Sequence, residues 1–173
     1  MFKIYTLKDD SKLEIYELID KKIRKLPRNQ DGSFNEFSNG FQDNDVDALR
    51  HAYVSGVYTM EYSEDVAEKL GRLQEFVFSG SSSAHPDAEN MDLWNNSVGR
   101  KYGKKAKSRD ELFEFLFKAL KNNELIIDPA DDRKYKGDTF IKRVPKSIVI
   151  KIQENKTGAN ILFYDFNKKI VMT

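Results

Sequence analysis

Asp47-Ala-Leu-Arg-His-Ala-Tyr53 and Met91-Asp-Leu-Trp-Asn-Asn-Ser-Val-Gly-Arg100 are the two stretches that decide the fold and hold most of the functional information. In both, apolar residues recur at the spacing of an amphipathic helix. Between these apolar positions stand residue types that catalyse reactions or bind polar ligands. We therefore predict two helices of one compact unit that share a polar site. The polar residues are Arg50, His51, Asp92, Asn95, Asn96 and Arg100.

Helical periodicity continues on both sides of these stretches. Asn44 or Asp45 can cap the second helix and Ser63 the third, because short polar side chains accept hydrogen bonds from free backbone N–H groups. Ser108-Arg-Asp-Glu111 has the form of a capping box and precedes a strongly apolar run. The sequence therefore predicts five helices, over about residues 11–26, 45–60, 64–77, 86–102 and 109–120.

The loop over residues 28–43 has no regular period and contains many turn-forming residues. Its phenylalanines include Phe34 and Phe37. Because burial of an aromatic ring is strongly favourable, we expect both rings to pack on the helical core.

The C-terminal forty residues or so change to short runs rich in β-forming residues, separated by polar turns. Residues 153–159 form a natural hairpin turn. A small sheet of this kind buries one face on the helices, because it does not fold alone. We predict an α+β fold in one domain, residues 1–173, with a helical core at about 44–121 and a β region at about 139–172. The predicted strands are residues 139–144, 147–152, 160–166 and 170–172.

Composition excludes several classes of function. The 173 residues include 29 basic and 28 acidic ones, so the net charge of +1 gives no global attraction to nucleic acid or to an anionic membrane. The absence of cysteine excludes disulfides, thiolate zinc sites and cysteine nucleophiles. The N-terminus lacks the apolar region of a secretory signal, and no stretch reaches the roughly 20 apolar residues of a membrane span. We expect the protein to be located in a cytoplasm, either that of its own cell or that of a host cell.

The second helix places Asp47, His51 and Ser55 on one face at i, i+4 and i+8. A carboxylate, an imidazole and a hydroxyl are the components of a catalytic triad. A triad requires these groups to converge on a substrate, whereas one straight helix spreads them along its length. The pattern therefore predicts that Asp47 orients His51 and does not predict a Ser-His-Asp mechanism.

The fourth helix places Asp92, Asn95 and Asn96 beside its apolar stripe, where side chains are half buried and need partners. Two interpretations stay open. In the first, these residues form a structural polar network with neighbouring helix ends. In the second, they line a cleft with His51, and Arg50 or Arg100 binds an anion. Only the second interpretation gives these residues a role in binding a ligand.

Metal and nucleic-acid sites find less support in the sequence. A metal site would need His51 and Asp92 to converge with His85 or Glu75, without the spacing of a known motif, so no metal ligand is assigned. Five cations lie between Arg100 and Lys107, but cations near a helix C-terminus also have a structural role.

The two opening stretches resemble a poorly characterised helical domain of bacterial polymorphic toxins of the RHS type and of some phage-related proteins. Its pattern is Asp-Ala-x-Arg-His-Ala, then a His-Glu pair at the end of the next helix, then Met-Asp-Leu-x-Asn-Asn-x-x-Gly-Arg. The resemblance extends over about residues 45–102. Between the two matching ends, this chain keeps Glu75 but has Gln74 in place of the histidine. The resemblance implies one site formed by Arg50, His51, Glu75, Asp92, Asn95, Asn96 and Arg100.

The leading hypothesis is a toxin-like or effector-like hydrolase. His51 would be the general acid/base, with Glu75 and Asp92 as the other catalytic residues. The substrate would be bound by Arg50, Asn95, Asn96 and Arg100. This mechanism requires His51 and Asp92 to lie within about 12 Å of each other, the reach of one small substrate.

The alternative is a non-enzymatic phage or mobile-element protein that binds and inhibits a host protein on a degenerate toxin-like scaffold. Gln74 favours this alternative, because it removes an imidazole. Nucleic-acid binding through Arg100 to Lys107 is the least favoured hypothesis, since no recognisable nucleic-acid module surrounds these cations. The sequence identifies no cofactor, substrate or oligomeric state.

Overall fold

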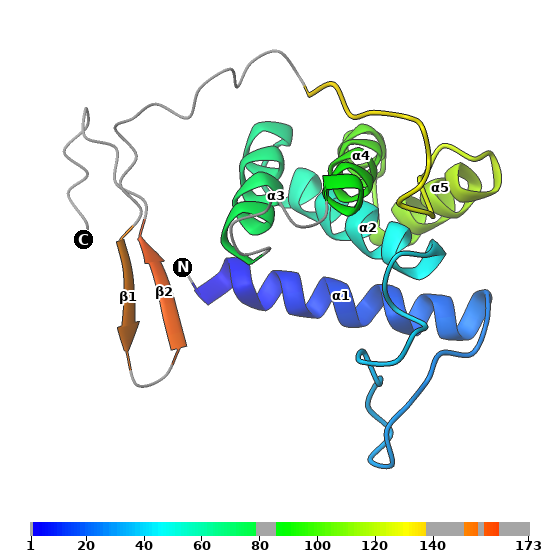
Figure 1. Ribbon diagram of the computed structural model, residues 1–173, viewed down its shortest axis with the longest axis horizontal. Coiled ribbons are helices and arrows are strands. Elements are labelled where there is room, and N and C mark those ends of the chain that lie inside the picture. The colour runs from blue at the N-terminus through cyan, green and yellow to red at the C-terminus, as the bar shows by residue number, and fades with distance from the viewer. Residues whose placement is uncertain (1, 79–85, 138–150, 156–157, 163–173) are drawn as a thin grey trace. The chain divides into compact units, whose positions relative to one another are not determined.

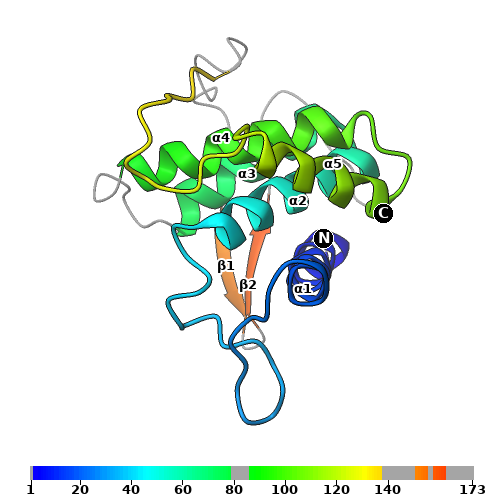
Figure 2. The same ribbon diagram turned by 90° about the vertical axis from the view of Figure 1, so that its right-hand side faces the viewer.

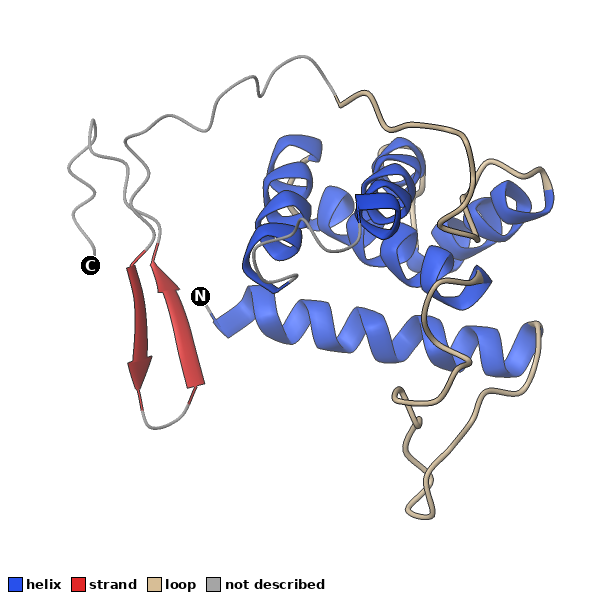
Figure 3. Ribbon diagram, viewed as in Figure 1, coloured by secondary structure: helices blue, strands red, loops and turns tan. Residues whose placement is uncertain are grey.

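The computed structural model describes residues 2–78, 86–137, 151–155 and 158–162, with side chains over residues 6–72 and 86–137. The chain divides into two compact units, residues 1–135 and residues 136–173. The first unit contains five helices and the second a β-hairpin (Figures 1 and 3). Within these described residues, no helix is both long and apolar enough to cross a membrane. The helices are α1 (Phe2–Lys22), α2 (Asp45–Glu61), α3 (Glu64–Phe78), α4 (Pro86–Gly103) and α5 (Arg109–Lys121).

The predicted five helices are confirmed, but the bounds of the first one are wrong. Helix α1 begins at Phe2 and ends at Lys22, whereas the sequence predicted residues 11–26. Residues 2–22 contain neither glycine nor proline, so no backbone-breaking residue prevents the helix from extending upstream. Its end is fixed by Asp20, whose Oδ1 accepts a hydrogen bond from the backbone N–H of Leu26 at 2.8 Å. This bond folds the chain into a turn before Pro27.

The predicted N-caps are confirmed. Asn44 Oδ1 accepts hydrogen bonds from the backbone N–H groups of Val46 and Asp47, at 2.9 and 3.2 Å. Ser63 Oγ and Ser108 Oγ accept the corresponding bonds at the starts of α3 and α5, at 3.3 and 3.2 Å. Each cap satisfies donors that the first turn of a helix leaves free. The cap at Asn44 also sets where α2 begins, and thereby the positions of the polar residues along it.

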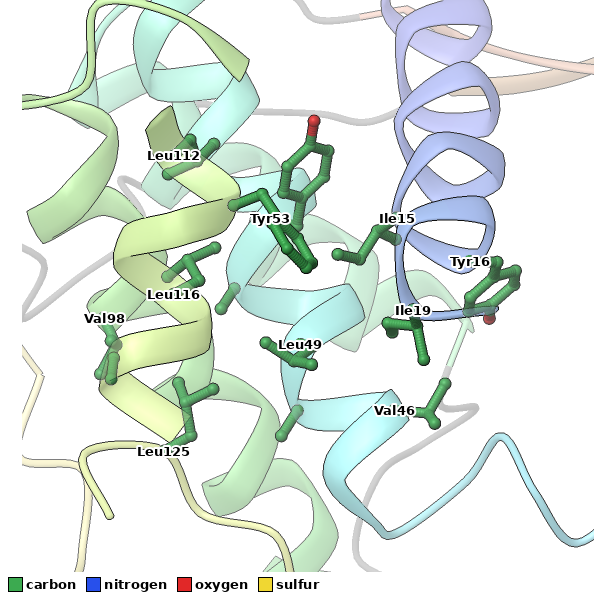
Figure 4. Close-up of a cluster of buried hydrophobic side chains, with 14 of the residues drawn as sticks. Ile15, Tyr16, Ile19, Val46, Leu49, Tyr53, Val98, Leu112, Leu116 and Leu125 are labelled. Atoms are coloured by element: carbon green, nitrogen blue, oxygen red, sulfur yellow. The ribbon is translucent and has the colours of Figure 1, made fainter. Parts of the chain in front are cut away.

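Helix α2 is the centre of the first unit and packs against each of the other four helices. Figures 1 and 2 show α1 crossing on one side of α2, with α3, α4 and α5 grouped around the rest of it. Its side chains Leu49 and Tyr53 are almost completely buried. In Figure 4 they lie between Ile15 of α1 and Leu116 of α5. Burial of this apolar surface is the main force that holds the helices together.

Helices α2 and α4 approach each other closely at glycine residues. A Cβ atom at Gly99 would lie 2.7 Å from the carbonyl carbon of Ala52 and would overlap the carbonyl oxygen. A Cβ at Gly103 would lie 2.5 Å from the carbonyl oxygen of Gly56. Residues four apart on α4 thus meet residues four apart on α2, in the same order along the chain. The two helices therefore run in the same direction with their backbones nearly touching.

The loop between α1 and α2 packs on the core through aromatic residues, one of which differs from the prediction. Phe34 is buried as predicted, but Phe37 is fully exposed, and Phe41 is buried instead. The rings of Phe34 and Phe41 both meet Tyr16 edge to face, with centroids 5.5 and 4.9 Å away. The second buried ring of the loop is therefore Phe41, four residues later than the predicted Phe37.

The second unit contains the antiparallel pair β1 (Lys151–Asn155) and β2 (Gly158–Leu162). Lys151 lies opposite Leu162 and Asn155 opposite Gly158. The ladder includes residues 153–155 and 158–159, which the sequence assigned to the turn. Residues 139–144 and 170–172 lie outside the described residues. The larger sheet and the single-domain organisation stay predictions.

Candidate functional site

The backbone contact between α2 and α4 brings the two polar stretches together. His51 precedes Ala52, the residue of α2 that meets Gly99, and Asp92 lies two turns before Gly99 on α4. His51 Nε2 is 3.1 Å from Asp92 Oδ1 and 3.5 Å from Asp47 Oδ1. The requirement that His51 and Asp92 lie within the reach of one small substrate is met. A buried group of Asp47, His51 and Asp92 thus sits between the two helices.

Arg50 supplies the positive charge of this group. Its Nε donates a hydrogen bond to Asp47 Oδ1 at 3.1 Å, and its Nη2 donates to the same oxygen and to His51 Nε2, the latter at 2.7 Å. Burial opposes the charge of Arg50, but the neighbouring Asp47, Tyr16 and Asp92 outweigh it, so the pKa of Arg50 is raised. The arginine therefore stays charged between two carboxylates.

His51 is held in its neutral form. Its side chain is only 7% exposed, and this burial lowers the pKa of His51 well below 6.5. The charges of Arg50 and Lys8 lower this pKa further, while a hydrogen bond with Asn96 acts in the opposite direction. Because a guanidinium can only donate, the contact of Arg50 with Nε2 favours the tautomer that has its proton on Nδ1. His51 is thus a neutral imidazole whose basic nitrogen faces Arg50 and Asp92.

The same group has the spacing of a metal site. Asp47, His51 and Asp92 each offer one ligand atom, and the three atoms lie within 4.8 Å of one another. Ligands at about 2.1 Å from a tetrahedral zinc ion are about 3.4 Å apart, which is close to the distances from His51 Nε2. The guanidinium of Arg50 contacts two of the three groups and supplies a cation there. A divalent ion would have to displace it.

The structure gives Asn95 and Arg100 other partners. Asn95 is fully buried, donates to the carbonyl of Ile126 at 2.8 Å and accepts from the N–H of the same residue at 2.9 Å. Arg100 is also buried and donates to the Tyr135 hydroxyl at 3.2 Å. Both side chains hold the segment that follows α5. Glu75 lies on α3, but its side chain is outside the described residues.

Two cations of the basic run after Gly99 are paired with carboxylates. Lys101 pairs with Glu124 at 2.8 Å and Lys104 with Glu64 at 2.7 Å. Arg100, as shown above, is buried. These contacts give Arg100, Lys101 and Lys104 a structural role within the helical unit.

Sequence reasoning missed two cations near His51. Lys8 and Lys12 of α1 line a pocket together with Arg50 and His51. Nothing local in the sequence relates α1 to α2, and the predicted start of α1 excluded Lys8 from the helix. Ser55 lines the same pocket. From the sequence, its hydroxyl was considered only as a component of a catalytic triad.

Comparison with models of protein families identifies the family of this chain. Residues 29–124, more than half of the chain, match the model of a domain of unknown function, DUF6973. The chain belongs to this family. The DUF6973 match includes α2 to α5 and therefore the whole buried group, whereas α1 lies outside it.

The comparisons add no activity to the DUF6973 match. No curated protein and no solved structure matches the chain. DUF6973 has no assigned function, and nothing in the match links it to RHS-type toxins or to phage proteins.

Proposed function

We propose that the DUF6973 unit of this chain is a hydrolase whose site is the buried group between α2 and α4. The observation that carries the proposal is the neutral, buried His51 between the carboxylates of Asp47 and Asp92, beside an open pocket. A neutral imidazole is a competent general base near neutral pH. A buried carboxylate–histidine pair with a perturbed pKa in a cleft is typical of catalytic sites.

Each residue of the group has a chemical role in this proposal. His51 Nε2 takes a proton from the attacking water, and Asp92 Oδ1, 3.1 Å away, stabilises the imidazolium that results. Asn96 orients the imidazole ring through its hydrogen bond. Asp47 holds Arg50, and its second oxygen accepts from the backbone N–H of Asp43 at 2.9 Å, which fixes the carboxylate.

Arg50 controls access to the base. In the structure its Nη2 donates to His51 Nε2, so the lone pair that would accept a proton is occupied. The side chain of Arg50 is 22% exposed and lines the pocket. A substrate that attracts the guanidinium toward the pocket would release Nε2. An anionic group on the substrate would do this most effectively.

Replacement of His51 tests the proposal. We expect His51→Ala to lower kcat/KM by about 10²- to 10⁴-fold, the usual contribution of a general base. The measurement is a screen of wild-type protein against chromogenic carboxylic and phosphoric esters, followed by kinetics of the variant. The resemblance to toxin domains adds the expectation that expression of the wild type slows growth of a host cell and that expression of His51→Ala does not.

The matched control is Asp87→Asn on α4, because Asp87 is exposed and pairs with Lys134 rather than with the buried group. This variant should keep wild-type activity, and thermal melting followed by circular dichroism should show both variants folded. Equal activity and equal growth inhibition by wild type and folded His51→Ala would contradict catalysis. That outcome would favour the alternative of a protein that binds a host protein without catalysis.

A further inference from the structure

The pocket beside His51 is formed by four helices. The empty space there amounts to about 390 Å³, a value that includes open solvent. Helix α1 contributes two lysines, α2 most of the floor, α3 a wall of small residues, and α4 one asparagine. The residues with polar groups that line it are Lys8, Lys12, Arg50, His51, Ser55, Tyr58 and Asn96.

The charge of the pocket wall is positive. Lys8 and Lys12 are one turn apart on α1, and Arg50 faces them from α2. Among the residues that the structure describes, none that lines the pocket is acidic. Lys12 does pair with Glu36 at 2.9 Å, and Arg50 with Asp47, but these carboxylates do not line the pocket. Lys12 and Arg50 are thus each held by a carboxylate outside the pocket, while their side chains line it.

Ser55 is an independent indication of a ligand. Its side chain lines the pocket and the residue is only 3% exposed. Within the described part of the chain, its Oγ has no hydrogen-bond partner. Buried hydroxyls normally have a hydrogen-bond partner. We therefore expect a ligand in the cationic pocket to supply the acceptor for Ser55 Oγ.

The residues that α3 contributes to the pocket are small. Ala67 and Gly71 of α3 line the pocket, and a Cβ atom at Gly71 would lie 3.3 Å from Asn96 Nδ2. A larger residue at either position would fill the space or displace Asn96. The small side chains of α3 therefore leave space in the pocket beside Asn96.

We propose that this pocket binds a phosphate-type group, with Lys8, Arg50 and Ser55 as its main ligands. A tetrahedral phosphate offers acceptor oxygens in several directions, which suits donors on separate helices better than a planar carboxylate does. The bound group would also attract Arg50 away from His51 Nε2. This part of the inference rests on the proposed function, because it assumes that the hydrolase acts on a phosphate ester.

Binding of inorganic phosphate to the full chain tests the inference. By isothermal titration calorimetry, wild type should bind phosphate, and Lys8→Gln should bind it about tenfold or more weakly, as expected for a lost charged hydrogen bond. Ser55→Ala should also weaken binding, although it removes a hydroxyl without a partner and so should not harm folding. The control is Lys21→Gln, an exposed lysine of α1 that does not line the pocket, which should bind like wild type.

The outcomes separate this inference from the proposed function. Lack of phosphate binding by wild type, or equal binding by folded Lys8→Gln and wild type, would overturn the phosphate site even if an ester is hydrolysed. Phosphate binding that depends on Lys8 and Ser55 but is unchanged in His51→Ala would support the site. If this occurs without any hydrolysis, only the proposed function fails.

Discussion

Gly99→Ala is expected to be among the most damaging single substitutions in the helical unit. Its Cβ would overlap the carbonyl oxygen of Ala52 and lie 2.7 Å from the carbonyl carbon, where both atoms belong to the backbone of α2. Backbone cannot rotate away as a side chain can, so α4 has to move as a whole. Overpacking costs about 1–3 kcal/mol in ordinary cores and more where relaxation is blocked. Urea denaturation should show a loss of free energy of unfolding at the upper end of this range or beyond it.

The matched control is Gly71→Ala on α3. There the nearest atom to the added Cβ is Asn96 Nδ2 at 3.3 Å, the end of a side chain. Both substitutions gain about the same helix propensity, roughly 0.5–1 kcal/mol, so their difference isolates the contact with α2. Similar unfolding free energies for the two variants would contradict the close backbone contact.

Asn95→Ala should have the second large effect on stability. Asn95 and Ile126 are both fully buried, and the amide of Asn95 satisfies both the N–H and the carbonyl of Ile126. Removal of the amide leaves two buried backbone groups without partners, at about 1–3 kcal/mol each. We therefore expect a loss of about 2–6 kcal/mol in the free energy of unfolding, measured by urea denaturation.

Asn90→Ala is the matched control, because Asn90 makes the same two kinds of hydrogen bond at a more solvent-exposed position. Asn90 also donates to one backbone carbonyl, that of Arg133 at 2.9 Å, and accepts from one backbone N–H, that of Tyr135 at 2.7 Å. It is only half buried, so water can replace the lost bonds. The cost should be about 1 kcal/mol. A larger loss for Asn90→Ala than for Asn95→Ala would show that burial does not determine these energies.

The local features of the fold were predictable from sequence, because they depend on neighbouring residues. The caps at Asn44, Ser63 and Ser108 follow from the hydrogen-bonding capacity of single side chains beside a helical pattern. The start of α1 was predicted wrongly because its first residues have no strong apolar period. The exchange of Phe37 for Phe41 as the buried ring depends on the path of an irregular loop, which no periodicity specifies.

Part of the site was also predictable from the sequence, because it depends on helical periodicity. His51 and Asp92 were expected to meet because both lie beside the apolar stripes of helices that pack together, and they do. The partners of Asn95 and Arg100 could not be predicted, because they belong to the irregular segment after α5. The pocket cations of α1 depend on a helix crossing that is set by tertiary packing alone.

The most direct test of the account is the titration of the His51 ring by ¹H–¹⁵N nuclear magnetic resonance, with His51→Gln used to assign its signals. We predict a neutral ring with its proton on Nδ1 at about pH 6, where an exposed histidine is largely protonated. Burial and the charges of Arg50 and Lys8 keep the pKa of His51 well below 6.5. A His51 that titrates at or above 6.5, or that carries its proton on Nε2, would contradict the proposed base.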